Sequence, residues 1–189
     1  MKVLLISLML MATVAHAADG KLKAGVFDPP RMAPDFTLES SHGGEVKLSR
    51  YRGKVVALGF GFSHCPEICP TTLAMLAKAR QRMGAAGKDF QVVYVTVDPE
   101  RDSPERLRAY LTRFDPSFVG ATGTPARLGQ VRDAYGIAAA RKMGKDAAYG
   151  VDHSSFVYLI DREGRLRALA PYGRSADDIA HDVAILLNK

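Results

Sequence analysis

Continuous apolar runs alternate with amphipathic segments along most of the chain. Residues 55–62 (VVALGFGF) and 91–97 (QVVYVTV) are almost entirely apolar, which is typical of central strands buried on both faces. Shorter segments of strand character flank turn-forming residues, and they predict an N-terminal and a C-terminal β-hairpin. These paired segments are 36–38 with 46–48, and 154–160 with 166–169. A short edge strand is expected at 119–120.

Four further segments place apolar residues at helical spacing. They are residues 70–83, a segment that begins at residue 104, residues 124–135 and residues 176–187. Ser103 suits the N-cap of the second helix and Pro104 its first position. Strands that alternate with helices predict an α/β domain with a mixed central sheet and helices on both faces. Since the C-terminal hairpin is followed by a helix, we predict a thioredoxin-like fold with an N-terminal β-hairpin.

The first 17 residues have the composition of a secretory signal peptide. Lys2 precedes an uncharged apolar run at 3–14, and a small-x-small cleavage site ends at Ala17. The run is shorter than the roughly 20 residues that span a bilayer. We therefore expect cleavage and a periplasmic or otherwise exported protein; an uncleaved segment would anchor the protein to the membrane. Residues 18–34 are expected to form an irregular lead-in, and residues 35–189 one thioredoxin-like domain.

The chain is basic, with a formal net charge of +6. Its basic residues are scattered and do not alternate with exposed aromatic residues, so nucleic-acid binding is not indicated. A solvated basic surface accounts for this charge. The same surface suits an acidic partner protein or peripheral contact with an anionic membrane.

The two cysteines of the chain, Cys65 and Cys69, lie between the predicted strand 55–62 and the predicted helix 70–83. A disulfide across so short a loop would stabilise the fold little, which favours reactive or metal-binding thiols. The end of a central strand is where α/β sites form, and a helix N-terminus favours thiolate over thiol. Four positions apart on a helix, the sulfurs can form a disulfide or bind one metal ion. The spacing therefore leaves both a redox pair and a metal site open.

A third ligand is available in His153, just before the predicted strand 154–160. Two thiolates and one imidazole fit a trigonal copper site, because soft sulfur selects Cu(I) and imidazole also suits Cu(II). Zinc would need a fourth ligand, which water could supply. A histidine at a strand edge that bonds only to backbone is the alternative. Asp98 ends the second central strand, where it either orients a metal ligand or only sets up the turn with Pro99.

Three segments, in order, resemble the signature of the Sco/SenC family of copper-binding assembly proteins. They are FGFSHCPEICP at 60–70, VDPERDSP at 97–104, and YGVDHS at 149–154 followed by YLID at 158–161. The resemblance covers about residues 33–187. It implies a thioredoxin-like domain that binds one copper, as Cu(I) or Cu(II), through Cys65, Cys69 and His153.

The resemblance also implies a function and partners. Members of this family help to load the dinuclear copper centre of cytochrome c oxidase, so we expect an exported, non-enzymatic metallochaperone. The copper-accepting subunit of the oxidase is the expected partner, and a copper donor and a thioredoxin-like reductant are further candidates. One departure is that family members often keep an N-terminal membrane anchor, whereas this chain has a signal that reads as cleavable.

The alternative function is enzymatic. A thiol-disulfide reductase would keep the cysteines of the oxidase copper site reduced, with Cys65 and Cys69 as its redox pair and no need for His153 as a ligand. A peroxidase with the same fold is less well supported, because Arg101 is only a nominal candidate to assist a peroxidatic cysteine. His64, although next to Cys65, is expected to be an exposed loop residue.

Overall fold

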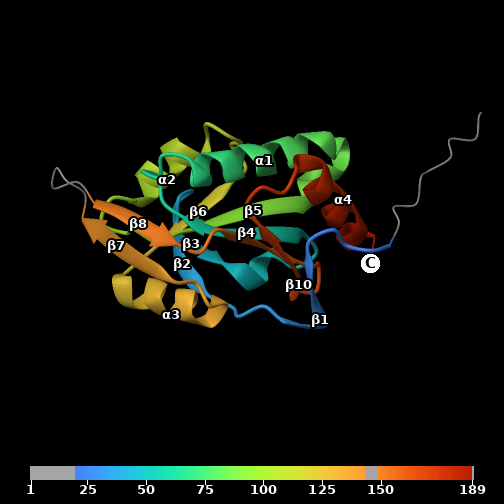
Figure 1. Ribbon diagram of the computed structural model, residues 1–189, viewed down its shortest axis with the longest axis horizontal. Coiled ribbons are helices and arrows are strands. Elements are labelled where there is room, and N and C mark those ends of the chain that lie inside the picture. The colour runs from blue at the N-terminus through green and yellow to red at the C-terminus, as the bar shows by residue number, and fades with distance from the viewer. Residues whose placement is uncertain (1–19, 144–148, 189) are drawn as a thin grey trace, which may run out of the picture.

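The computed structural model describes residues 20–143 and 149–188 of the chain (Figure 1). The segment predicted to be a signal peptide, residues 1–17, lies outside this described part. The main sheet has eight strands in the order β1-β10-β9-β4-β5-β6-β2-β3. Their bounds are β1 Gly25–Met32, β2 Thr37–Ser40, β3 Glu45–Lys47, β4 Val55–Gly61, β5 Phe90–Thr96, β6 Val119–Thr122, β9 Phe156–Ile160 and β10 Arg165–Pro171.

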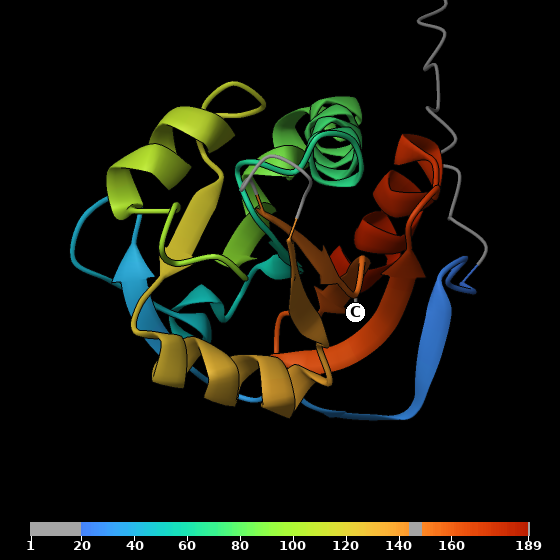
Figure 2. The same cartoon turned by 60° about the vertical axis from the view of Figure 1, so that its left-hand side comes forward.

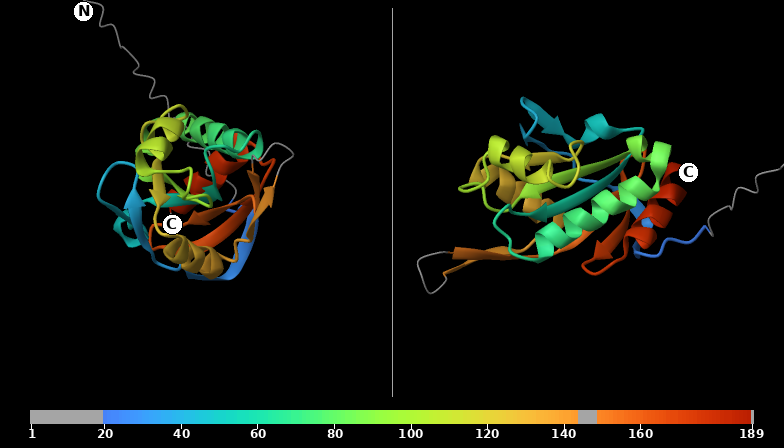
Figure 3. Two further views of the ribbon diagram at one scale, coloured as in Figure 1. Left: turned by 90° about the vertical axis from the view of Figure 1, so that its left-hand side faces the viewer. Right: turned by 90° about the horizontal axis from the view of Figure 1, so that it is seen from above.

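The sheet is mixed, and helices cover both of its faces. Strands β4, β5 and β6 run parallel, while the other neighbouring pairs are antiparallel. The helices are α1 Ile68–Arg82, α2 Pro104–Leu111, α3 Pro125–Tyr135 and α4 Ala176–Leu187. Helices α1 and α4 pack side by side on one face, where α2 lies over β6, and α3 covers the opposite face (Figures 1 and 3). The predicted fold, including the N-terminal hairpin of β2 and β3, is confirmed.

The two central strands pair in parallel along their whole length. Every residue of β4 and β5 is buried, as the apolar runs predict. The pairing runs from Val55 opposite Phe90 to Gly61 opposite Thr96, so both strands end at the same edge of the sheet. The segments that follow them, which carry the cysteines and Asp98, therefore meet at this edge.

The prediction of an irregular lead-in at residues 18–34 is wrong over part of its length. Residues 25–32 form β1, which pairs antiparallel with β10 at one edge of the sheet (Figure 2). The ladder is interrupted between Val26 and Arg31, where Pro29 and Pro30 lie. Proline cannot donate to a ladder and is tolerated at an edge strand. These prolines and the exposed side chains of β1 concealed the strand from pattern reading.

A further hairpin, which the sequence did not predict, projects from the end of the domain where β4 and β5 finish (Figures 1 and 3). It consists of β7 Ala139–Met143 and β8 Tyr149–His153, which pair only with each other. His153 therefore ends β8, whereas the sequence pattern places it just before the strand formed by β9. Side chains of β8 are half-buried or exposed, so they lack the apolar pattern of a core strand.

No helix within the described ranges combines the length and the apolar character that crossing a bilayer requires.

A prediction concerns the packing of α2 on β6. A Cβ added at Gly120 would lie 2.8 Å from Leu107 Cβ and 3.0 Å from Leu111 Cδ1. We expect Gly120→Ala to lower the free energy of unfolding by about 1–3 kcal/mol, because the core is overpacked. The matched control is Gly129→Ala in α3, where the added Cβ would lie 3.9 Å from the Arg132 side chain. There the same change should be neutral or stabilising by up to about 1 kcal/mol. Urea denaturation of both variants measures the difference, and equal effects would contradict the packing of α2.

Candidate metal centre

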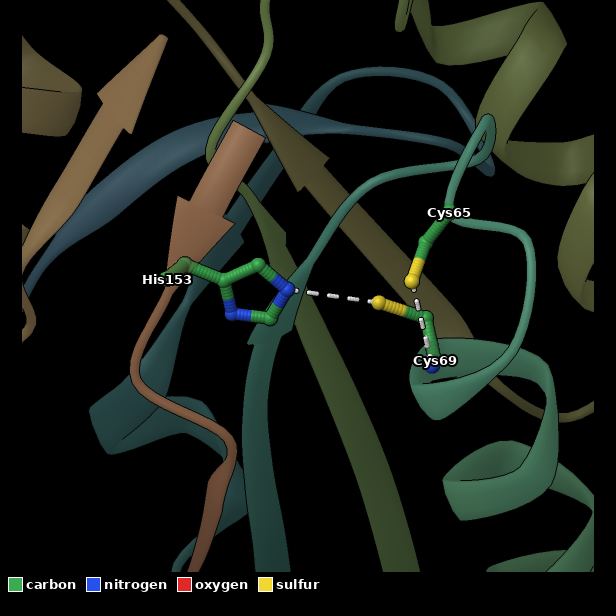
Figure 4. Close-up of side chains that lie close together, drawn as sticks. All are labelled: Cys65, Cys69 and His153. Carbon is green, nitrogen blue, oxygen red and sulfur yellow. Dashed lines mark hydrogen bonds between the residues drawn. The ribbon is translucent and has the colours of Figure 1, made fainter. Parts of the chain in front are cut away.

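The two cysteines lie on either side of the start of α1. This helix begins at Ile68, two residues before the predicted start, so Cys69 is in its first turn and Cys65 is in the preceding loop. The first N–H groups of a helix have no partner within it. Here the N–H of Cys69 donates to the Cys65 sulfur over 3.4 Å (Figure 4). The helix start therefore holds the two thiols close together.

The loop that carries Cys65 is fixed by a buried carboxylate. The N–H of Ser63 donates to both oxygens of Asp102, over 3.0 and 3.3 Å. Thr96 at the end of β5 donates to the same carboxylate, and Arg106 of α2 donates to the Ser63 hydroxyl. The carboxylate of Asp102 thus joins the cysteine loop to the end of β5. Its signal in the sequence is a charged residue just after the second central strand, which runs beside the first.

His153 turns its Nε2 atom toward the thiols. Its Nδ1 lies 2.9 Å from the carbonyl oxygen of Ser154. A carbonyl only accepts, so Nδ1 carries a hydrogen and donates it, and this bond fixes the ring with Nε2 facing the thiols. Nε2 is 3.4 Å from the Cys69 sulfur, and Figure 4 shows the ring pointing at the sulfurs. The ring also meets Phe62 edge to face, with centroids 5.9 Å apart. The backbone-bonded alternative and the ligand role are therefore compatible.

Together these side chains form a three-atom ligand set. The two sulfurs and the imidazole nitrogen all lie within 4.8 Å of one another. Cys69 is buried, while Cys65 and His153 are half-buried, so the cluster is partly accessible. Neither cysteine forms a disulfide. Two soft sulfurs and one nitrogen are the donor set that suits copper, and particularly Cu(I).

The two thiols share one proton unequally. A hydrogen bond from Cys69 lowers the pKa of Cys65 to about 4, and His153 adds to this effect, while burial opposes it. The pKa of Cys69 is raised well above its ordinary value by the Cys65 sulfur and by burial. The metal-free site therefore holds a Cys65 thiolate and a Cys69 thiol. A metal that binds both sulfurs displaces the remaining proton.

Asp98 holds the hairpin that carries His153. Among the described residues, it forms no hydrogen bond with Cys65, Cys69 or His153. Its buried carboxylate accepts from the Tyr149 hydroxyl over 2.8 Å and forms an ion pair with Arg101. Arg101 in turn donates to the Tyr149 carbonyl over 3.0 Å and lies over its ring, 3.8 Å from the centroid. Tyr149 begins β8 and His153 ends it. The contacts of Arg101 to the hairpin could not be foreseen, because the hairpin was not predicted.

His64 lies apart from the ligand set. Its ring is exposed, and Nδ1 lies 3.1 Å from the Ser63 hydroxyl. It is not among the three residues whose donor atoms converge. The expectation that His64 is an exposed loop residue is confirmed.

Comparisons with known proteins identify similar chains. A family model described as SCO1/SenC matches residues 26–188. An SCO2-like protein of Rickettsia conorii is 36% identical over 140 residues, which cover 73% of this chain and 68% of the relative. The structure of Bradyrhizobium japonicum ScoI with copper bound is 32% identical, with a TM-score of 0.76, and covers 82% of this chain and 99% of that one. Arabidopsis thaliana ScoI with copper bound is 31% identical, with a TM-score of 0.77, and covers 84% and 99%.

Two separate findings thus support copper as the metal of this site. Similar proteins have been solved with copper bound. In the present chain, two thiol sulfurs and an imidazole nitrogen converge from a loop, a helix and a hairpin. The thioredoxin-like fold is likewise supported both by the strand order of this chain and by its similarity to these solved structures.

The unequal thiols generate a prediction for the metal-free, reduced protein. Alkylation rates of Cys65 followed against pH should show a midpoint near 4, the pKa to which Cys69 and His153 lower this thiol. In Cys69→Ala the midpoint should rise toward the ordinary value of about 8.5, since the principal hydrogen-bond donor is gone. His153→Ala should produce a smaller rise, because its hydrogen bond contributes less. A wild-type midpoint near the ordinary value would show that Cys69 does not stabilise the Cys65 thiolate.

Proposed function

Because the chain belongs to the SCO1/SenC family, we propose that it is a copper metallochaperone that binds one copper ion through Cys65, Cys69 and His153. It delivers this copper to the dinuclear copper centre of cytochrome c oxidase during assembly. Similar Sco proteins have been solved with copper bound, and one Sco structure is described as a member of the Sco family of cytochrome c oxidase assembly proteins. The observation that carries the proposal is the approach of the His153 Nε2 atom to 3.4 Å from the Cys69 sulfur, across a sequence separation of 84 residues.

The geometry suits a carrier that must also release its cargo. Cys69 is buried, whereas Cys65 and His153 are half-buried and face the accessible side. An acceptor thiolate or imidazole can therefore attach to copper before the ligands of this chain leave. Loading displaces the proton that Cys69 holds, so both sulfurs bind as thiolates. Transfer by ligand exchange leaves the oxidation state of copper unchanged.

The acceptor is the copper-binding subunit of the oxidase, and a copper donor and a thioredoxin-like reductant complete the expected set of partners. An exported or membrane-associated location fits this role. The signal-like composition of residues 1–17 supports that location. The reductant is needed whenever Cys65 and Cys69 become oxidised, because a disulfide cannot bind copper in this way.

Thiol-disulfide reduction is the second candidate function, favoured by the unequal thiols. The half-buried Cys65 thiolate would attack a disulfide of the oxidase, form a mixed disulfide and release one substrate thiolate. Cys69 would then lose its proton and attack the Cys65 sulfur, which releases the second substrate thiolate. The pair of this chain ends as a disulfide, and a thioredoxin-like dithiol must reduce it. This enzymatic role does not require His153 to bind a metal.

Copper binding by the His153 variant separates the two functions. We expect His153→Ala to lower copper affinity by at least about 10-fold and to change the Cu(II) absorption spectrum, because one of three ligands is lost. The matched control is His64→Ala, which removes an exposed neighbouring histidine outside the ligand set and should leave affinity and spectrum unchanged. Titration with a competing chelator measures affinity.

Unchanged stoichiometry, affinity and spectrum in His153→Ala would contradict the three-ligand site. If that variant also kept wild-type disulfide-reducing activity and supported oxidase assembly in cells, reduction would be the better assignment. Loss of assembly together with intact reducing activity would favour the copper carrier.

Asp98 is proposed to position His153 through the hairpin. Asp98→Asn keeps an acceptor for the Tyr149 hydroxyl but removes the charge that pairs with Arg101. We expect copper affinity to fall by about 10-fold, in the range seen for groups that orient metal ligands. Glu163→Gln is the matched control, because it removes an exposed ion pair to Arg165, at the start of β10 and outside the hairpin. Copper affinity equal to wild type in Asp98→Asn would refute the positioning role and leave Asp98 as a turn residue.

A further inference from the structure

Two alternate glycines in the buried strand β4 make room for one tyrosine. Gly59 and Gly61 face the same side of the sheet, since side chains alternate along a strand. A Cβ at Gly59 would lie 3.4 Å from a ring carbon of Tyr94 in the neighbouring strand β5. A Cβ at Gly61 would overlap the Tyr94 hydroxyl and would lie 2.8 Å from the Cys69 sulfur. The Tyr94 ring thus runs along β4, and its hydroxyl ends beneath Cys69.

The Tyr94 hydroxyl is buried without a partner. Tyr94 is 2% exposed, and its hydroxyl has no hydrogen bond of normal geometry among the described residues. It lies near enough to the Cys69 thiol to oppose the rise in the pKa of that thiol. Buried polar groups are nearly always paired, because an unpaired one destabilises the fold. Phenylalanine would fill the same space without this cost. We therefore expect the hydroxyl to form its hydrogen bond when the site holds a metal.

We propose that Tyr94 is a positioning residue of the metal centre, and that its hydroxyl donates a hydrogen bond to the Cys69 sulfur when copper is bound there. The inference rests on the proposed copper function and goes beyond its three ligands. The Gly61 position places the Tyr94 hydroxyl beside the Cys69 sulfur. A cysteine that binds a metal does so as a thiolate, so the loaded site sets a buried, negatively charged acceptor next to this donor. Hydrogen bonds to charged acceptors are about twice as strong as those between neutral groups.

Such a hydrogen bond changes the properties of the metal centre. It withdraws electron density from the sulfur, and hydrogen bonding around a cysteine ligand tunes the potential of copper. The energy of sulfur-to-Cu(II) charge transfer rises, and Cu(I) is favoured over Cu(II). Tyr94 would thereby help the site to retain Cu(I), the form that thiolates prefer.

Tyr94→Phe tests this inference with little change in shape. Copper affinity should fall about 10- to 100-fold, the loss of one hydrogen bond to a charged group. The thiolate-to-Cu(II) absorption band should move to longer wavelength. Without metal, the midpoint of thermal unfolding should stay the same or rise, because an unpaired buried hydroxyl has been removed.

The matched control is Tyr158→Phe. The Tyr158 hydroxyl is also buried, but it donates to the Tyr135 carbonyl, and both residues pack with Phe60 on the sheet face opposite Cys69. This variant should lower the metal-free unfolding midpoint and leave copper affinity and the absorption band as in the wild type. Tyr94→Phe should therefore change copper affinity without lowering the unfolding midpoint, whereas Tyr158→Phe should lower the unfolding midpoint without changing copper affinity.

Three outcomes would overturn the inference. Wild-type affinity and an unshifted band in Tyr94→Phe would show that the hydroxyl makes no bond to the loaded sulfur. A metal-free Tyr94→Phe protein destabilised as much as Tyr158→Phe would show that the hydroxyl has a purely structural role. A wild-type protein that binds no copper would overturn the proposed function, and this inference with it.

Discussion

The in-register parallel pairing of β4 with β5 is the constraint on which the metal centre depends. Because Gly61 lies opposite Thr96, the segments that follow both strands leave the sheet at the same edge. One of them carries Cys65, and the other carries two buried carboxylates. Asp102 binds the cysteine loop through the N–H of Ser63, and Asp98 binds the hairpin through Tyr149. A sheet of different strand order would separate these partners.

The three proposed ligands are held with unequal firmness. The thiols lie at the junction of a fully buried strand and the first turn of α1, where Asp102 and the helix N–H groups fix them. His153 instead belongs to a hairpin outside the main sheet, which polar contacts of Asp98 and Arg101 hold in place. The difference would suit the proposed copper carrier. The imidazole would leave copper with less disruption of the core than either sulfur, so exchange with an acceptor would begin there.

Several local features destabilise the metal-free fold and are explained by the site. Two glycines weaken a central strand, and the hydroxyl of Tyr94 is buried without a partner. Two thiols are also placed so close that only Cys65 gives up its proton readily. Natural proteins depart from local rules mainly at functional sites. All these departures lie within one region, around the sulfur of Cys69, and copper would relieve those that concern charge and hydrogen bonding.

The sequence by itself determined the central strands, the four helices, the fold class, and the three residues proposed as ligands. Burial on both faces leaves continuous apolar runs, and the cysteine and histidine motifs are short and local. Only the tertiary structure decided how β1 and the β7–β8 hairpin pair, and that Asp102 and Tyr94 serve the cysteines. Prolines interrupt β1 and exposed side chains line both segments, so neither carries a periodic apolar pattern. Contacts such as that of Tyr94 with Cys69 depend on strand order and register, which no local stretch of residues encodes.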